Sequence, residues 1–143
     1  MKNKSFTIED EMACIRLSNE FAYYLDHKQY TKAAALFTED GVFERPGASA
    51  KGRSQIVAFY EARPVSPVSW HMCGSPVFIS VKEDEAEAIT PFTLYHAKPV
   101  ENGLPQLGSG PAAIAEFKDT YRRTVEGWKI HSRKAAPVLV AEH

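Results

Sequence analysis

The chain has 143 residues, which is enough to bury a hydrophobic core within one domain. Its 17 Lys and Arg residues nearly balance 18 Asp and Glu residues, so no basic surplus favours nucleic acid as a partner. Hydrophobic residues make up 44% of the chain, as in ordinary soluble proteins, and no apolar run is long enough to cross a bilayer.

Residues 1–11 are polar and lack the apolar segment of a signal peptide, so we expect a cytoplasmic protein. Cys14 and Cys73 form no CxxC pair, which predicts two free thiols rather than a disulfide framework or a zinc site. No repeat, low-complexity segment or linker divides the sequence. We therefore expect one domain over residues 1–143.

The N-terminal half predicts three helices. Thr7 is a typical helix N-cap followed by three acidic residues, and its helix should end near His27. An alanine-rich helix is expected over 29–37, ended by a turn at 38–41 and followed by a brief strand over 42–45. A third helix is expected over 52–63, where a proline-containing loop interrupts it.

The C-terminal half changes to the period of strands. Strands are expected over 77–81, 85–98, 112–124 and 128–134. Pro91 within the second of these suggests a sheet edge or a bulge. Helices followed by an antiparallel meander predict an α+β fold with the helices packed on one face of a curled sheet.

Asp26 is an acid at the end of an apolar helical stripe. The stripe follows steps of four and three along the first helix: Ile8, Met12, Ile15, Asn19, Ala22 and Asp26. A second apolar set would widen the buried face: Cys14, Leu17, Phe21 and Leu25. A buried carboxylate needs a partner, although Asp26 could instead be a solvated turn acid beside His27.

His71 and His96 are the candidate partners of that acid. His71 opens the meander after Trp70, and His96 shares a strand face with apolar neighbours. Each could also be a structural histidine with a satisfied hydrogen bond. One imidazole held by a carboxylate makes a general base, and a second can serve a leaving group or a carbonyl, which suffices for an elimination reaction.

Other chemistry finds little support in the sequence. His71, His96 and Glu44 could in principle bind a metal, but the sequence contains no HxH or HExxH spacing that would support such a site. We therefore expect no metal. No GxSxG elbow or Gly-rich phosphate loop precedes a helix, and we expect no cofactor. Three further residues are candidates for binding and orienting a substrate: Tyr24, Arg45 and Trp70.

Four segments in order resemble SnoaL-like proteins of the NTF2-like superfamily. These are Leu25–Tyr30 and Leu36–Phe43, then Gly52–Ile56 at the start of the third helix and Arg122–Ile130 at the last hairpin. The resemblance covers nearly the whole chain. It implies a cone-shaped fold, in which three helices pack on a strongly curved, mixed and largely antiparallel sheet with a pocket between the two layers.

Within that superfamily the chain is most similar to the scytalone dehydratase-like group. Scytalone dehydratase and the hexachlorocyclohexane dehydrochlorinase pair an Asp of the first helix with a His, and Asp26 and His71 fall on those positions. His96 falls on a second His of the dehydratase, on the following long strand. The resemblance thus implies catalytic roles for these three residues.

The chain also departs from the dehydratase. Leu25 stands at one of two tyrosine positions that bind the substrate through a water, and Arg45 or Glu44 stands near the other. Glu116 and Lys118 fall near a Ser and Asn pair that lines the dehydratase pocket. The resemblance therefore implies a substrate other than scytalone.

We expect a cofactor-independent lyase that acts on a small, apolar, cyclic molecule. A non-catalytic binding protein, an isomerase or cyclase, and a small subunit of a larger enzyme are the alternatives, because this scaffold hosts many functions. A curved sheet with an exposed face commonly pairs with another copy, so we also expect a homodimer or homotrimer.

Overall fold

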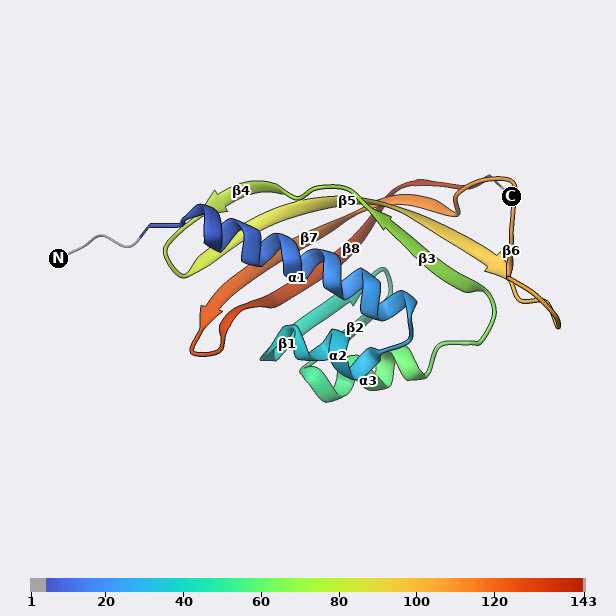
Figure 1. Cartoon of the computed structure of the whole chain (residues 1–143), viewed down its shortest axis with the longest axis horizontal. Helices are drawn as coiled ribbons and strands as arrows, with labels where there is room; N and C mark the ends of the chain where they lie inside the picture. The colour runs from blue at the N-terminus through green and yellow to red at the C-terminus, as the bar shows by residue number, and fades with distance from the viewer. Residues whose placement is uncertain (1–4, 143) are drawn as a thin grey trace.

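The computed structural model describes residues 5–142, which form three helices and an eight-stranded curved sheet (Figure 1). The helices are α1 (Ile8–Asp26), α2 (Tyr30–Ala35) and α3 (Arg53–Glu61). The strands are β1 (Phe37–Arg45), β2 (Ala48–Lys51), β3 (Val68–Cys73), β4 (Val77–Val81), β5 (Glu85–Lys98), β6 (Gln106–Leu107), β7 (Ala113–Thr124) and β8 (Gly127–Val140). Among the described residues, no helix has both the length and the apolar character that a membrane span requires.

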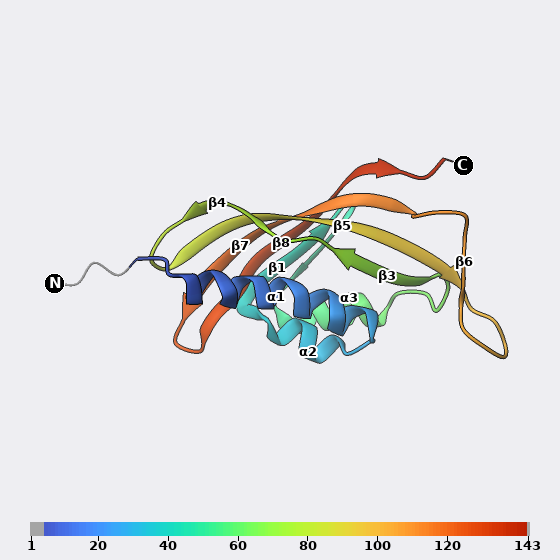
Figure 2. The ribbon, with the colours of Figure 1, turned by 45° about the horizontal axis from the view of Figure 1, so that its top comes forward.

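The sheet has the strand order β2-β1-β8-β7-β5-β3, and β4 and β6 also pair with β5. Every pairing is antiparallel except that of β1 with β8, which is parallel. The sheet arches over α1, and the three helices lie on its concave side (Figure 2). The predicted α+β class and the mixed, curved sheet are therefore confirmed.

Helix α1 begins with a complete capping box. The hydroxyl of Thr7 accepts a hydrogen bond from the backbone N–H of Asp10 at 3.2 Å, and the Asp10 carboxylate accepts one from the Thr7 N–H at 2.8 Å. The same carboxylate accepts a bond from the indole of Trp128 at 3.0 Å and pairs with Arg123 at 3.0 Å. The start of α1 is thus fastened to the β7–β8 hairpin, and Arg123 holds the pKa of Asp10 well below its usual range.

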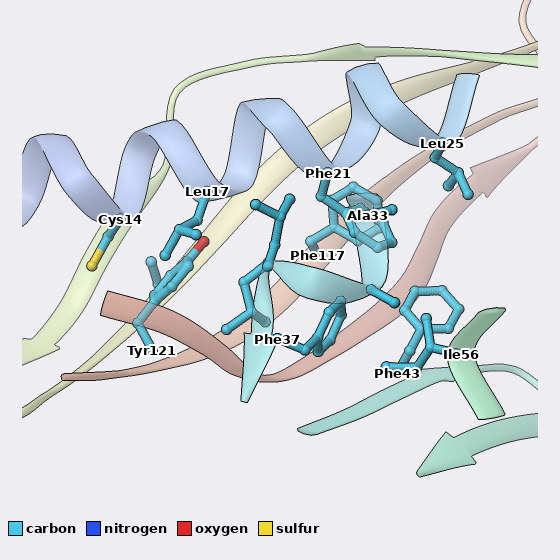
Figure 3. Close-up of a cluster of buried hydrophobic side chains, with 14 of the residues drawn as sticks. Cys14, Leu17, Phe21, Leu25, Ala33, Phe37, Phe43, Ile56, Phe117 and Tyr121 are labelled. Carbon is cyan, nitrogen blue, oxygen red and sulfur yellow. The ribbon is translucent and has the colours of Figure 1, made fainter. Parts of the chain in front are cut away.

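The buried face of α1 differs from the predicted stripe. Ile8 is 69% exposed and Met12 is 55% exposed, so the first part of that stripe faces solvent. The second apolar set forms the core face instead, and Figure 3 shows its four side chains on one side of the helix: Cys14, Leu17, Phe21 and Leu25. Asp26 follows Leu25 at the edge of this face, which explains why its side chain is still buried.

The predicted turn at 38–41 is wrong, because these residues lie inside β1. Along the pairing with β8, β1 advances from Phe37 to Val42 while β8 advances only from Ile130 to Ser132. The turn-forming residues therefore make a bulge within the strand. β2, which the sequence did not predict, pairs with the part of β1 beyond this bulge.

Pro91 lies in an interior strand that pairs with β7 without a register shift, so neither the predicted sheet edge nor the predicted bulge is found there. Its carbonyl accepts a hydrogen bond from the N–H of Gly74 at 2.8 Å, so its nitrogen points to the junction between β3 and β4. Both of those strands pair with β5, and neither continues across this junction. A residue without an N–H fits there because no ladder bond is required.

A buried ion pair joins three elements of the core. Arg133 of β8 donates to both carboxylate oxygens of Asp119 in β7, at 2.8 and 2.7 Å, and to the hydroxyl of Ser18 in α1 at 2.7 Å. Both members of the pair are fully buried. The guanidinium also lies 4.1 Å from the ring centroid of Phe117, which faces the cavity described next.

Candidate active site

One cavity opens between the helices and the concave face of the sheet. Its volume is about 530 Å³, which suits a small organic ligand. The elements contribute the following lining residues: Leu25, Asp26, Lys28 and Tyr30 from the α1–α2 junction; Phe43 and Arg45 from β1 and Pro46 from the turn after it; Phe59, Tyr60 and Glu61 from α3; Arg63–Pro67 from the following loop; Val68, Ser69 and His71 from β3; and Phe92, Leu94, His96, Ala113, Ala115, Phe117, Ala135 and Pro137 from β5, β7 and β8.

Asp26 and His71 are hydrogen-bonded to each other at one wall of this cavity. Oδ1 of Asp26 lies 2.6 Å from Nδ1 of His71, and Oδ2 accepts the backbone N–H of His71 at 2.9 Å. The two side chains are only 4% and 9% exposed. Each carboxylate oxygen therefore has its own partner, and the imidazole is held at both its ring and its backbone.

The end of α1 places Asp26 at this position. The N–H of Lys28 bonds to the carbonyl of Leu25 at 3.1 Å, and the N–H of Gln29 bonds to that of Tyr24 at 2.8 Å. Lys28 has a φ of 59°, the left-handed conformation of a Schellman motif. The helix thus ends at Asp26 with His27 as its C-cap, and its last turn faces β3.

The geometry fixes which nitrogen of His71 is free. A carboxylate can only accept hydrogen bonds, so the proton of the neutral imidazole lies on Nδ1. Nε2 is then unprotonated, and no described protein group forms a hydrogen bond with it. His71 lines the cavity with its ring against Phe92 at 5.5 Å and Phe117 at 6.3 Å between centroids. Nε2 is therefore the atom available to take a proton from a ligand.

His96 lines the same cavity from the neighbouring strand. In the β3–β5 pairing His71 lies opposite Leu94 and Ser69 lies opposite His96, so the two histidines share the concave face one step apart on the diagonal. Burial, with a smaller contribution from His71, lowers the pKa of His96 below its ordinary value. This shift favours the neutral imidazole of His96, which has an N–H to donate.

The three residues predicted to orient a substrate have different positions. Arg45 lines the cavity at its exposed rim. Tyr24 is absent from the lining and packs against Tyr23 at 5.8 Å between ring centroids. Trp70 is also absent from it, because it alternates with His71 along β3 and is 44% exposed on the opposite face. The structure therefore supports only Arg45 of the three as a contact for a ligand.

Alternation along strands also corrects two other expectations. Glu116 and Lys118 are not in the cavity lining, where Ala115 and Phe117 take their place from the same strand. Glu44 lies on the opposite face of the sheet from the histidines. Within residues 5–142 no group of three His, Cys, Asp or Glu residues is arranged to hold a metal ion.

Arg63 is a cavity residue that the sequence did not single out. It follows α3 and lies over the rings of Tyr60 and Tyr30, at 4.8 and 5.8 Å from their centroids. Its Nε is buried and has no hydrogen-bond partner. No spacing or motif marks such a residue, because its position depends on the path of an irregular loop.

Comparison with solved structures shows the same fold in several proteins. An NTF2-like protein with a cystatin-like fold from Novosphingobium aromaticivorans has a TM-score of 0.77 and 24% identity, over 92% of this chain and 83% of that one. A candidate scytalone dehydratase from the same organism has a TM-score of 0.73 and 20% identity, over 92% and 86%. LinA has a TM-score of 0.79 and 19% identity, over 95% and 90%.

No curated protein matches the sequence. Residues 7–134 match the SnoaL-like domain, which spans all three helices and most of the sheet. The resemblance noted in the sequence is thereby confirmed at the level of the family. This chain belongs to the SnoaL-like domain family.

Proposed function

We propose that the protein is a cofactor-independent lyase that removes water or a similar small group from a small, mostly apolar, cyclic substrate. The observation that carries the proposal is the 2.6 Å bond between Asp26 and His71 inside a ligand-sized cavity. The rest of the lining is mainly aromatic and aliphatic, which suits an apolar carbon framework. The similarity in fold to a candidate scytalone dehydratase is in keeping with this reaction type.

The proposed reaction starts with proton removal. Nε2 of His71 takes a proton from a carbon next to a carbonyl group, and Asp26 stabilises the imidazolium that forms. The electron pair moves on to the carbonyl oxygen, which accepts a hydrogen bond from the N–H of neutral His96.

The second step expels the leaving group. The electron pair returns to form a carbon–carbon double bond as a hydroxyl group departs from the adjacent carbon. The proton held by His71 joins that hydroxyl group, so water leaves and His71 is neutral again. The balance requires no cofactor, oxidant or metal.

A binding protein without turnover is the second candidate. The apolar lining alone would suit a carrier of small hydrophobic molecules. The two candidates differ in what they require of the dyad, because binding of an apolar molecule does not need an unprotonated Nε2 facing the cavity.

Solvent deuterium incorporation separates the candidates before the natural substrate is known. A panel of cyclic ketones and β-hydroxyketones is incubated with the protein in D₂O, and exchange at the acidic carbon and loss of water are followed by mass spectrometry. We expect His71→Ala and Asp26→Asn to slow exchange by about 10²- to 10⁴-fold, because general acid–base help of this kind has that size. Ligand binding should persist in both variants.

The chain offers a matched control pair outside the cavity. Asp40 and His131 are also an acid and an imidazole, 3.8 Å apart on the surface, and neither lines the cavity. Asp40→Asn and His131→Ala should keep the wild-type exchange rate. The lyase proposal fails if the dyad variants and these controls behave alike.

A further inference from the structure

The cavity carries positive charge that the protein itself does not neutralise. Arg63, Arg45 and Lys28 line it, and none of the ion pairs among residues 5–142 includes any of the three. The two lining carboxylates are Asp26, which is bonded to His71, and Glu61, which is exposed at the rim. A ligand with a negative group would therefore find partners that are still free.

Arg63 is the most constrained of these cations. Its guanidinium lies over the rings of Tyr60 and Tyr30, which are themselves stacked at 5.8 Å between centroids. Tyr60 is almost completely buried, so this support belongs to the core. Lys28 and Arg45 are exposed by comparison. The guanidinium is thus held by its face, which leaves its terminal Nη groups available for hydrogen bonds.

The Nε of Arg63 is a buried donor without an acceptor. Such groups are rare in folded proteins because the hydrogen bond to water is lost and nothing replaces it. The two Nη groups of Arg63 are not buried in this way and form no hydrogen bond with the described residues, so a ligand oxygen in the cavity can reach them. The two Nη groups of a guanidinium present parallel N–H bonds that match the two oxygens of a carboxylate.

We propose that Arg63 binds a carboxylate group of the substrate, so that the substrate class is small cyclic carboxylic acids. The inference rests on the proposed function only in taking this cavity as the substrate site. A planar carboxylate fits better than a phosphate, because a phosphate carries more charge and Arg63 is the one inner cation of the described lining.

The test compares acids with their neutral amides. Binding of benzoate, cyclohexanecarboxylate, 1-naphthoate and 2-naphthoate is measured by calorimetry beside benzamide, cyclohexanecarboxamide and the two naphthamides. We expect acids to bind more tightly than their amides to the wild type. Arg63→Met should weaken the acids by about 10- to 100-fold, the size of a hydrogen bond to a charged group, and leave the amides unchanged.

Two further variants separate recognition from general damage. Arg63→Lys keeps the charge but loses the paired N–H edge, so it should restore only part of the preference for acids. Arg16→Met removes an exposed arginine on α1 that does not line the cavity and should change nothing. Thermal unfolding of each variant shows whether it is folded. The comparison of acids with amides in the wild-type protein does not depend on any variant.

The inference is overturned if no acid in the series binds the wild type more tightly than its amide. It is also overturned if Arg63→Met weakens acids and amides equally. Deuterium incorporation is scored separately. If the protein prefers acids through Arg63 but never exchanges carbon-bound hydrogen, the inference about Arg63 stands and the lyase proposal fails. If it exchanges hydrogen but shows no preference for acids, the lyase proposal stands and the inference fails.

Discussion

At the scale of single residues, the site depends on the Asp26 carboxylate, whose two oxygens accept hydrogen bonds from different groups of His71. Oδ1 of Asp26 fixes the ring of His71, and Oδ2 fixes its backbone. An asparagine has one acceptor oxygen and cannot replace both contacts. The loss expected for Asp26→Asn therefore comes from orientation and tautomer as well as from charge.

Two other histidines predict how stability depends on pH. Burial lowers the pKa of His96 and of His131 in the folded protein, while the unfolded chain keeps a value of about 6.5. Below that pH the unfolded chain takes up protons that the folded protein does not, so their contribution to stability is complete above about pH 6.5 and declines as the pH falls toward the folded pKa values.

Urea unfolding at pH 7.5 and pH 5.5 checks this prediction. The wild type should be less stable at the lower pH, and the His96→Gln/His131→Gln double variant should show a smaller difference between the two conditions. An undiminished difference in the double variant would contradict the assigned pKa shifts.

The sequence identified part of the site because some of its signals are local. Asp26 stands out as an acid at the end of an apolar helix, and the resemblance to a family placed His71 beside it. The face of the helix was misjudged because two overlapping stripes fit the same period, and only packing shows that the one through Leu17 is buried. Arg63 gave no signal because an irregular loop sets its position.

At the scale of elements, the bulge in β1 and the junction between β3 and β4 opposite Pro91 were not predicted from the sequence. Residues 38–41 are typical of a turn, and Pro91 is typical of a sheet edge. The strands that pair with these segments determine the structure that they adopt. The long strand over 85–98 was predicted with its full bounds because alternation along it is strict.

The ion pair between Arg133 and Asp119 should be the most sensitive link between elements. Asp119→Ala leaves a buried guanidinium without its partner, and we expect a loss of about 3–5 kcal/mol in the free energy of unfolding. Asp84→Ala is the matched control, since Asp84 is 69% exposed in its pair with Arg123 and exposed pairs contribute about 0–1 kcal/mol. Urea titration of both variants measures these losses. Similar losses in the free energy of unfolding for the two variants would contradict the role of the buried ion pair.

At the scale of the whole molecule, the arch of the sheet separates two surfaces. The helices lie on the concave side (Figure 2), and the cavity opens between them and the sheet. Trp70 and Met72 alternate with His71 along β3, so they expose large apolar side chains on the other face. An apolar outer face is in keeping with the expected homodimer or homotrimer, which stays a prediction. The fold alone does not assign an activity to the protein. The central claim is therefore that the Asp26 carboxylate decides which ring nitrogen of His71 carries the proton.

Nitrogen-15 NMR of histidine-labelled protein at neutral pH tests that claim most directly. We predict that the neutral form of His71 carries its proton on Nδ1 and leaves Nε2 unprotonated, and that Asp26→Asn abolishes this preference. A His71 that carries its proton on Nε2, or one whose tautomer is the same with and without the Asp26 carboxylate, would contradict the account.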